Sequence, residues 1–96
     1  MKEEKGSINY NSIMSREGVS GILRYLHDHG EAKNVDLKTV IGNHYRLHDT
    51  MTALEQAGLV KTEYQTTPKR IYRYWLTAKG KAVSRRLMEI ERILKT

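Results

Sequence analysis

Apolar residues recur at helical spacing in the first third of the chain. A stripe of large aliphatic side chains at spacings of three and four residues predicts an amphipathic helix over residues 16–29. Ser15 is the expected N-cap of this helix, and Gly30 is expected to end it. The inward stripe consists of Val19, Ile22, Leu23 and Leu26.

The stretch from residue 34 to residue 60 predicts two helices joined by a tight turn. The first helix is expected over residues 35–41, with Asn34 as its cap and Gly42 in the left-handed conformation that ends it. Asn43 is expected to cap the second helix, and Gly58 to stop it. The inward side of the second helix carries Leu47, Thr50, Met51 and Leu54. Its opposite side carries His44, Tyr45, Arg46, Asp49, Thr52 and Ala53.

Strand-forming residues then dominate two short runs, residues 59–65 and 70–76. These runs predict a hairpin, and the single proline, Pro68, fits its tip because proline cannot donate to a strand ladder. Alternation along the second strand places Tyr72, Tyr74 and Leu76 on one face, and we expect Leu76 to point into the core.

A last helix is expected from Thr77, its cap, to about residue 94. Its apolar residues recur at spacings of 4, 3 and 4 and form a seam that resembles a coiled coil. This seam can pack on its own domain or on a second copy, and we favour a homodimer contact because so small a domain has little core face left for it. The seam consists of Val83, Leu87, Ile90 and Leu94.

Three motifs in this order resemble winged-helix regulators. They are LEQAGLV (residues 54–60), a basic hairpin, and LTAKG (residues 76–80), and together they resemble the MarR, PadR and ArsR groups over residues 19–83. The resemblance implies an α+β, mostly α, winged helix-turn-helix with a three-helix core, a two-stranded wing and a C-terminal dimerisation helix. It also implies a minor strand near residues 31–33. The sequence departs from these groups at two points: it has Asp49 on the second helix, and it lacks the Asp-x-Arg element that MarR-like wings often carry.

The expected organisation is an N-terminal arm (residues 1–14), the winged domain (15–80) and the C-terminal helix (77–96). The chain has 96 residues and a net charge of +6. Residues 1–60 hold seven basic and eight acidic side chains, whereas residues 61–96 hold ten basic and three acidic ones. A basic C-terminal third favours a polyanionic partner.

Composition excludes several kinds of chemistry. With no cysteine there is no disulfide, thiolate zinc site or cysteine nucleophile. His44 and His48 have the spacing of two metal ligands on a helix, but two ligands do not make a site, and we expect no metal and no other cofactor. The serines lack a nucleophile context, so we expect no enzyme. No apolar run reaches membrane-spanning length, and a cytoplasmic location is expected.

The positive indication is double-stranded DNA. The first residues of a second helix in this motif reach base edges in the major groove. Arg46 can bind guanine, Tyr45 can contact a phosphate or a thymine methyl group, and His44 can take either polar role. Asp49 either accepts from cytosine, orients Arg46, or indicates that this face does not enter the groove. The predicted DNA contacts are Lys38, His44, Tyr45, Arg46, Asp49, Thr52, Thr66, Thr67, Lys69 and Arg70.

The sequence therefore predicts a homodimeric DNA-binding regulator, most simply a repressor, with two rivals. One rival is a winged helix used as a protein-interaction module, and the other is an architectural protein that binds DNA without sequence preference. The sequence leaves open whether a small-molecule effector is sensed; such an effector would bind at the dimer seam or among Tyr25, Tyr72, Tyr74 and Trp75.

Overall fold

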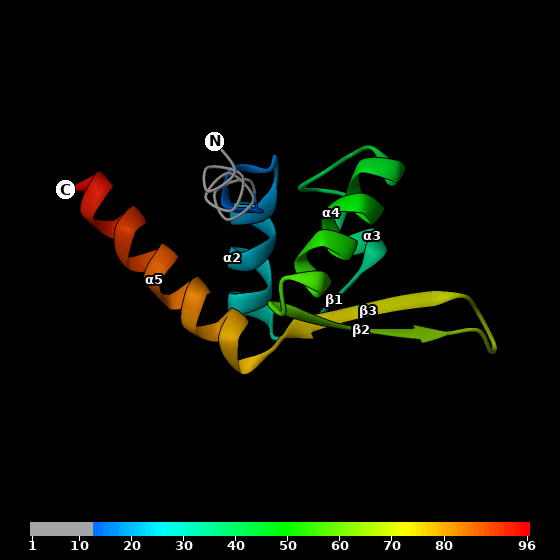
Figure 1. The fold of residues 1–96 in the computed structure, drawn as a ribbon. Helices are drawn as coiled ribbons and strands as arrows, with labels where there is room; N and C mark the ends of the chain where they lie inside the picture. Colours follow the sequence, from blue (N-terminus) through cyan, green and yellow to red (C-terminus); the bar gives the residue numbers. More distant parts are fainter. Residues whose placement is uncertain (1–12) are drawn as a thin grey trace, which may run out of the picture.

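The structure, a computed structural model, describes residues 13–96, so most of the predicted N-terminal arm lies outside the described residues. A helical turn at residues 13–15 leads into the main elements, which Figure 1 shows. In chain order these are α2 (Val19–His29), β1 (Ala32–Lys33), α3 (Asn34–Leu37), α4 (His44–Gln56), β2 (Val60–Gln65), β3 (Ile71–Leu76) and α5 (Ala78–Lys95). The order of the main elements matches the one that the apolar pattern predicts, and β1 is the minor strand that the resemblance implies.

The three strands form one antiparallel sheet in the order β1-β3-β2. Ala32 lies opposite Tyr74 at one edge, and the β2–β3 ladder runs from the Val60–Leu76 pair to the Gln65–Ile71 pair. The connection between β2 and β3 contains Pro68 at the hairpin tip, as predicted. This hairpin is the wing, and it extends well beyond the helices in Figure 1.

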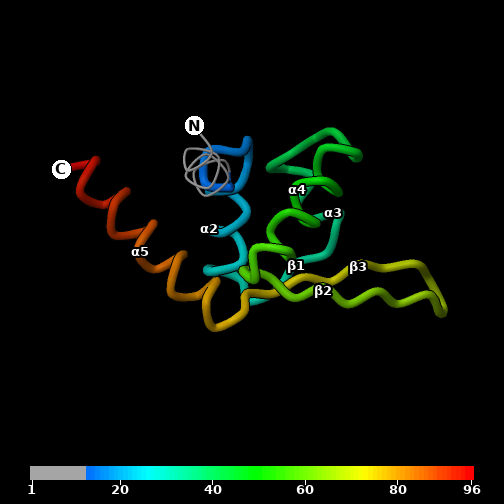
Figure 2. The backbone as a smooth tube through the Cα atoms, viewed as in Figure 1, coloured from blue at the N-terminus to red at the C-terminus, as the bar shows by residue number. Residues whose placement is uncertain are grey.

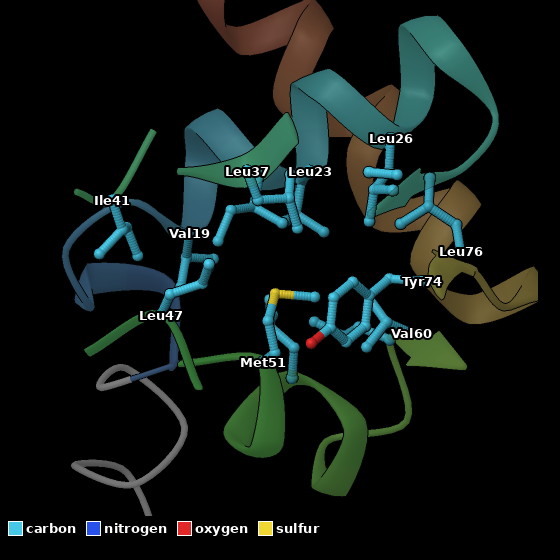
Figure 3. Close-up of a cluster of buried hydrophobic side chains, with 14 residues drawn as sticks. Val19, Leu23, Leu26, Leu37, Ile41, Leu47, Met51, Val60, Tyr74 and Leu76 are labelled. Carbon is cyan, nitrogen blue, oxygen red and sulfur yellow. The ribbon is translucent and has the colours of Figure 1, made fainter. Parts of the chain in front are cut away.

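One continuous core lies between the helices and the inner face of the sheet. Figure 3 shows side chains from α2, α3, α4 and β3 converging there, with the ring of Tyr74 beside Met51 and Val60. The predicted inward residues of α2 and α4 are all buried, and so is Leu76. The buried apolar set is Val19, Ile22, Leu23, Leu26, Ala32, Leu37, Ile41, Leu47, Met51, Leu54, Leu59, Val60, Tyr74 and Leu76.

Four of the predicted helix ends are confirmed. The Asn43 side-chain oxygen accepts from the Arg46 N–H at 3.0 Å, and the Thr77 hydroxyl accepts from the Gly80 N–H at 2.9 Å. Gly30 and Gly58 take positive φ values of 87° and 80° where α2 and α4 end. These signals are local in sequence, which is why the pattern finds them.

Three other predicted ends are wrong. Helix α2 starts at Val19 after Gly18 in the left-handed conformation, rather than after Ser15. Gly42 is not among the described glycines with positive φ; α3 instead ends in a turn where the Ile41 N–H donates to the Leu37 carbonyl at 3.1 Å. Asn34 is the first residue of α3 rather than its cap, because the Asp36 carboxylate accepts from the Lys33 N–H at 2.9 Å and takes over that role.

The first half of α5 packs closely on the rest of the domain. Gly80 and Ser84 are buried, and a Cβ built at Gly80 would lie 1.9 Å from the backbone oxygen of Leu59. The Ser84 hydroxyl donates to the Lys81 carbonyl at 3.0 Å and lies 3.4 Å from Nδ1 of His27 on α2. Small residues at these positions therefore let α5 approach both α2 and the start of β2.

Candidate nucleic-acid interface

The first turn of α4 presents its predicted DNA-contacting side chains to solvent. The Asn43 cap fixes where the helix begins, and His44, Tyr45 and Arg46 then project from its open end. Tyr45 is 79% exposed, and its ring meets that of His44 edge-on with the centroids 5.8 Å apart. An exposed aromatic and a cation at the start of a helix are suited to contact a groove or a phosphate.

Arg46 is already ion-paired. Its guanidinium contacts the carboxylate of Glu17, which lies in the turn before α2. Gly18 positions this turn, because its φ of 83° and the 2.5 Å approach of a built Cβ to Ile41 exclude a larger residue there. The sequence pattern missed Glu17, since nothing in it indicates that residue 17 lies against residue 46.

Asp49 lies near the same pair. A small hollow of about 250 Å³ is lined by Arg16, Glu17, Ile41, Arg46, Asp49 and Thr50. Two carboxylates therefore line the same hollow as Arg46, and the one that forms its ion pair in the described structure is Glu17. The three roles predicted for Asp49 all stay predictions: contact with cytosine, orientation of Arg46, and exclusion of this face from the groove.

The wing tip carries the other cluster of predicted contacts. Thr66, Thr67, Lys69 and Arg70 are all exposed, and the Gln65 side chain donates to the Thr67 carbonyl at 2.8 Å. Neither Lys69 nor Arg70 forms an ion pair with another described residue. Their charges are therefore free to meet an anionic surface.

An aromatic row joins the wing to α4, and the sequence pattern did not find it. The His48 ring on α4 lies 6.3 Å from that of Tyr72, which in turn lies 4.5 Å from Tyr64 and 6.2 Å from Tyr74. Alternation along β3 puts Tyr72 and Tyr74 on one face, but pairing with His48 depends on how α4 crosses the sheet. The row connects the wing to α4.

Tyr74 also ties α3 to the sheet. Its buried hydroxyl donates to Oδ1 of Asn34 at 2.6 Å. Burial, followed by the neighbouring Tyr72 and Glu55, raises the pKa of Tyr74 from 10.0 to about 12. The neutral phenol is therefore the form that the folded domain holds.

The two predicted contacts outside these clusters are also accessible. Lys38, after α3, and Thr52, one turn beyond Asp49 on α4, are exposed. Figure 2 shows the start of α4 and the wing on one side of the molecule and the C-terminal end of α5 on the opposite side. A long polyanion and a second protein chain could thus be bound without competing for one surface.

The predicted seam on α5 divides into two parts. Val83 and Leu87 are partly buried against the core of their own domain. Ile90 and Leu94 are 53% and 77% exposed, and Ile93, which the predicted seam did not include, is 70% exposed. In the middle of α2, Arg24 forms an ion pair with Glu91 on α5.

Other chemistry finds no support within residues 13–96. No group of three or more metal-ligating side chains comes together in this range. No helix in the same range has the length and apolar character needed to cross a membrane. The four aromatic residues proposed for an effector do not lie on one surface. Tyr72 and Tyr74 are on the inner face of β3, whereas Trp75 is on the outer face. Tyr25 stacks on His29, with the ring centroids 4.0 Å apart.

Comparison with solved structures finds the same fold in transcriptional regulators. A protein described as a transcriptional regulator, ytfH from Salmonella typhimurium, is 23% identical with a TM-score of 0.81, over 93% of this chain and 80% of that one. A transcriptional regulator homologue from Pyrococcus horikoshii OT3 is 20% identical with a TM-score of 0.69, over 91% and 94%. NadR, solved in complex with 4-hydroxyphenylacetate, is 24% identical with a TM-score of 0.70, over 95% and 71%.

These likenesses confirm the predicted fold class. The chain is a winged helix-turn-helix of the α+β type, as the motifs around residues 54–60 and 76–80 indicated. No protein-family model matches the sequence, and no curated protein matches it significantly.

Proposed function

We propose that the protein binds a specific site on double-stranded DNA as a homodimer and regulates transcription, acting as a cytoplasmic repressor. The observation that carries the proposal is the pairing of an exposed α4 N-terminus with a basic wing tip on one side of the molecule. An α-helix fits the major groove, and a hairpin beside it reaches the adjacent backbone or minor groove. Solved regulators with the same fold add support.

Sequence preference is assigned to the first turn of α4. Arg46 supplies a planar pair of donors that suits the O6 and N7 acceptors of guanine, and Tyr45 and His44 supply neighbouring contacts. The wing residues Lys69 and Arg70 are assigned to phosphates, which fix the register without reading sequence.

Dimerisation is assigned to the second half of α5. Ile90, Ile93 and Leu94 leave an apolar surface in water, and burying such side chains stabilises an assembly by about 1.5–3 kcal/mol each. A two-fold contact at this end leaves both α4 helices available for half-sites about 34 Å apart. Repression follows most simply, since a dimer over a promoter excludes other proteins sterically.

Selection of preferred sites from a random DNA pool tests the proposal directly. A specificity ratio well above one between selected and random DNA supports sequence-specific regulation. Uniform, salt-dependent binding would favour the architectural rival, and no binding at low salt would favour the protein-interaction module.

Two sets of variants then separate base reading from phosphate binding. Arg46→Ala should weaken binding to the selected site by about 1–3 kcal/mol and relax the preference at one base position. Lys69→Ala with Arg70→Ala should weaken binding to selected and random DNA alike and lower the salt slope by about one for each phosphate that the variant no longer neutralises. An equal effect of Arg46→Ala on all DNA would contradict base reading.

A further inference from the structure

A second hollow, of about 710 Å³, lies where the end of α2, the outer face of the sheet and the first turns of α5 meet. Figure 1 shows these three segments converging away from the start of α4 and the wing tip. None of the residues that line the hollow belongs to α4 or to the wing tip. Its volume lies in the range of small-molecule binding pockets.

The α5 wall of this hollow is cationic. Lys81 and Arg85 are four residues apart, so their side chains project from the same side of the helix. Neither forms an ion pair with another described residue. An ammonium and a guanidinium held one helical turn apart are suited to bind a phosphate group.

The sheet wall offers a flat apolar surface. Trp75 lies on the outer face of β3, opposite the core face that holds Tyr74, and its side chain is only partly buried. Leu26 of α2 and Leu76 also line the hollow, although both side chains are largely buried in the core. An indole in such a position can stack on a planar ring.

A carboxylate completes the lining and narrows the ligand class. Lys61 lies directly opposite Trp75 in the ladder, so Glu63, two residues further along β2, is on the same outer face at the diagonal position. Glu31 is paired with Arg73 at 3.4 Å, whereas Glu63 has no ion pair among the described residues. If the ligand were a simple aromatic acid, its apolar ring would face the Glu63 carboxylate and offer no hydrogen bond. A ligand with an amino group on the ring would donate a hydrogen bond to that carboxylate.

We infer that this hollow binds a nucleoside monophosphate. The base stacks on Trp75, its exocyclic amino group donates to Glu63, and the phosphate is held by Lys81 and Arg85. This assignment uses the flat, acidic and basic walls together, and it is independent of the DNA-binding proposal.

The chain has one tryptophan, so the indole N–H resonance of Trp75 reports on this hollow alone. Adenosine 5′-monophosphate should shift that resonance saturably at millimolar concentration, and at least about tenfold more tightly than adenosine, which lacks the phosphate. Ribose 5-phosphate, which lacks the base, should bind at least about tenfold more weakly as well, because it cannot stack on the indole.

Lys81→Gln with Arg85→Gln should abolish the preference for the monophosphate over adenosine. Lys38→Gln with Lys69→Gln is the matched control, since it removes the same charge from exposed positions outside the hollow and should bind like the wild type. An absent shift, equal binding of the monophosphate and adenosine, or equal binding of ribose 5-phosphate would overturn the inference. So would wild-type affinity in the Lys81 and Arg85 variant. No DNA is used, so these outcomes leave the proposed regulatory function untouched.

Discussion

The two halves of α5 share one apolar repeat but differ in how far the rest of the domain covers it. In the first half, Val83 and Leu87 pack on the core of the same domain, and Gly80 permits backbone contact. In the second half, Ile90, Ile93 and Leu94 are more than half exposed, although they continue the same side of the helix. An apolar seam in the sequence therefore predicts a helix with an apolar side, but the length of the domain beside it decides how much of that side the same domain buries.

The largest expected effect falls on the first half. Gly80→Ala should destabilise the fold by about 3 kcal/mol, because the new methyl group meets the Leu59 backbone oxygen, which cannot move aside as a flexible side chain could. Urea unfolding measures the change in stability. Gly42→Ala is the control, since a Cβ there meets nothing within 4 Å, and a similar destabilisation in both variants would contradict this explanation.

The second half should govern assembly rather than folding. Ile90→Lys with Leu94→Lys places like charges across the proposed two-fold contact, so sedimentation should find a monomer with a wild-type helical signal. Its affinity for a palindromic DNA site should fall by about 100-fold, because a monomer cannot bind both half-sites at once. A wild-type protein that sediments as a monomer at micromolar concentration would exclude this model of assembly.

A matched pair of truncations compares the two halves directly. In the double-lysine background, Leu87→Ala should cost about 1.5 kcal/mol of unfolding free energy, since Leu87 is partly buried. Ile93→Ala in the same background should change it by less than about 0.5 kcal/mol, because that side chain is largely exposed. Equal changes would mean that the second half of α5 also packs on its own domain.

The smallest effect concerns the core that the first half of α5 helps to cover. Tyr74→Phe removes the hydrogen bond to Asn34 and should cost about 1 kcal/mol at neutral pH. In the wild type, the unfolded tyrosine ionises near pH 10, whereas the folded one ionises near its pKa of about 12, so stability should fall as the pH rises through this window. Urea unfolding between pH 9 and pH 12 should show a smaller decline for Tyr74→Phe, and an equal decline would assign it to other groups.

The sequence predicted those features of the fold that depend on neighbours within one turn or one strand. The Asn43 and Thr77 caps, the inward stripes of α2 and α4, and the hairpin tip all have such local signals. Asn34 was misassigned because the Tyr74 hydroxyl, 40 residues away, donates a hydrogen bond to its side chain. The Asp36 carboxylate accepts the N–H at the start of α3 instead. A side chain with two possible hydrogen-bonding roles cannot be assigned before the packing is known.

The candidate DNA contacts likewise divide into features with a local sequence signal and features that depend on how distant elements pack. Exposure of the α4 and wing residues agrees with the pattern, because the polar side of an amphipathic helix faces solvent. The pairing of Arg46 with Glu17 and the contact of His48 with Tyr72 depend on how separate elements cross, and no spacing rule predicts them. Their contribution to DNA binding is a prediction that the variants of Arg46 and the wing address.

If α4 binds DNA as proposed, the ion pair between Arg46 and Glu17 opposes that binding. A guanidinium that binds a base or a phosphate would leave Glu17, and because both side chains are more than 60% exposed, breaking the pair would cost about 0–1 kcal/mol. Random DNA offers only a diffuse anionic replacement for that partner, whereas a correctly placed guanine offers two aligned acceptors. The gain at a matching guanine exceeds that cost, so Glu17 would lower affinity without removing the preference for the selected site. Glu17→Gln should accordingly bind selected and random DNA more tightly, which competition binding at fixed salt measures directly.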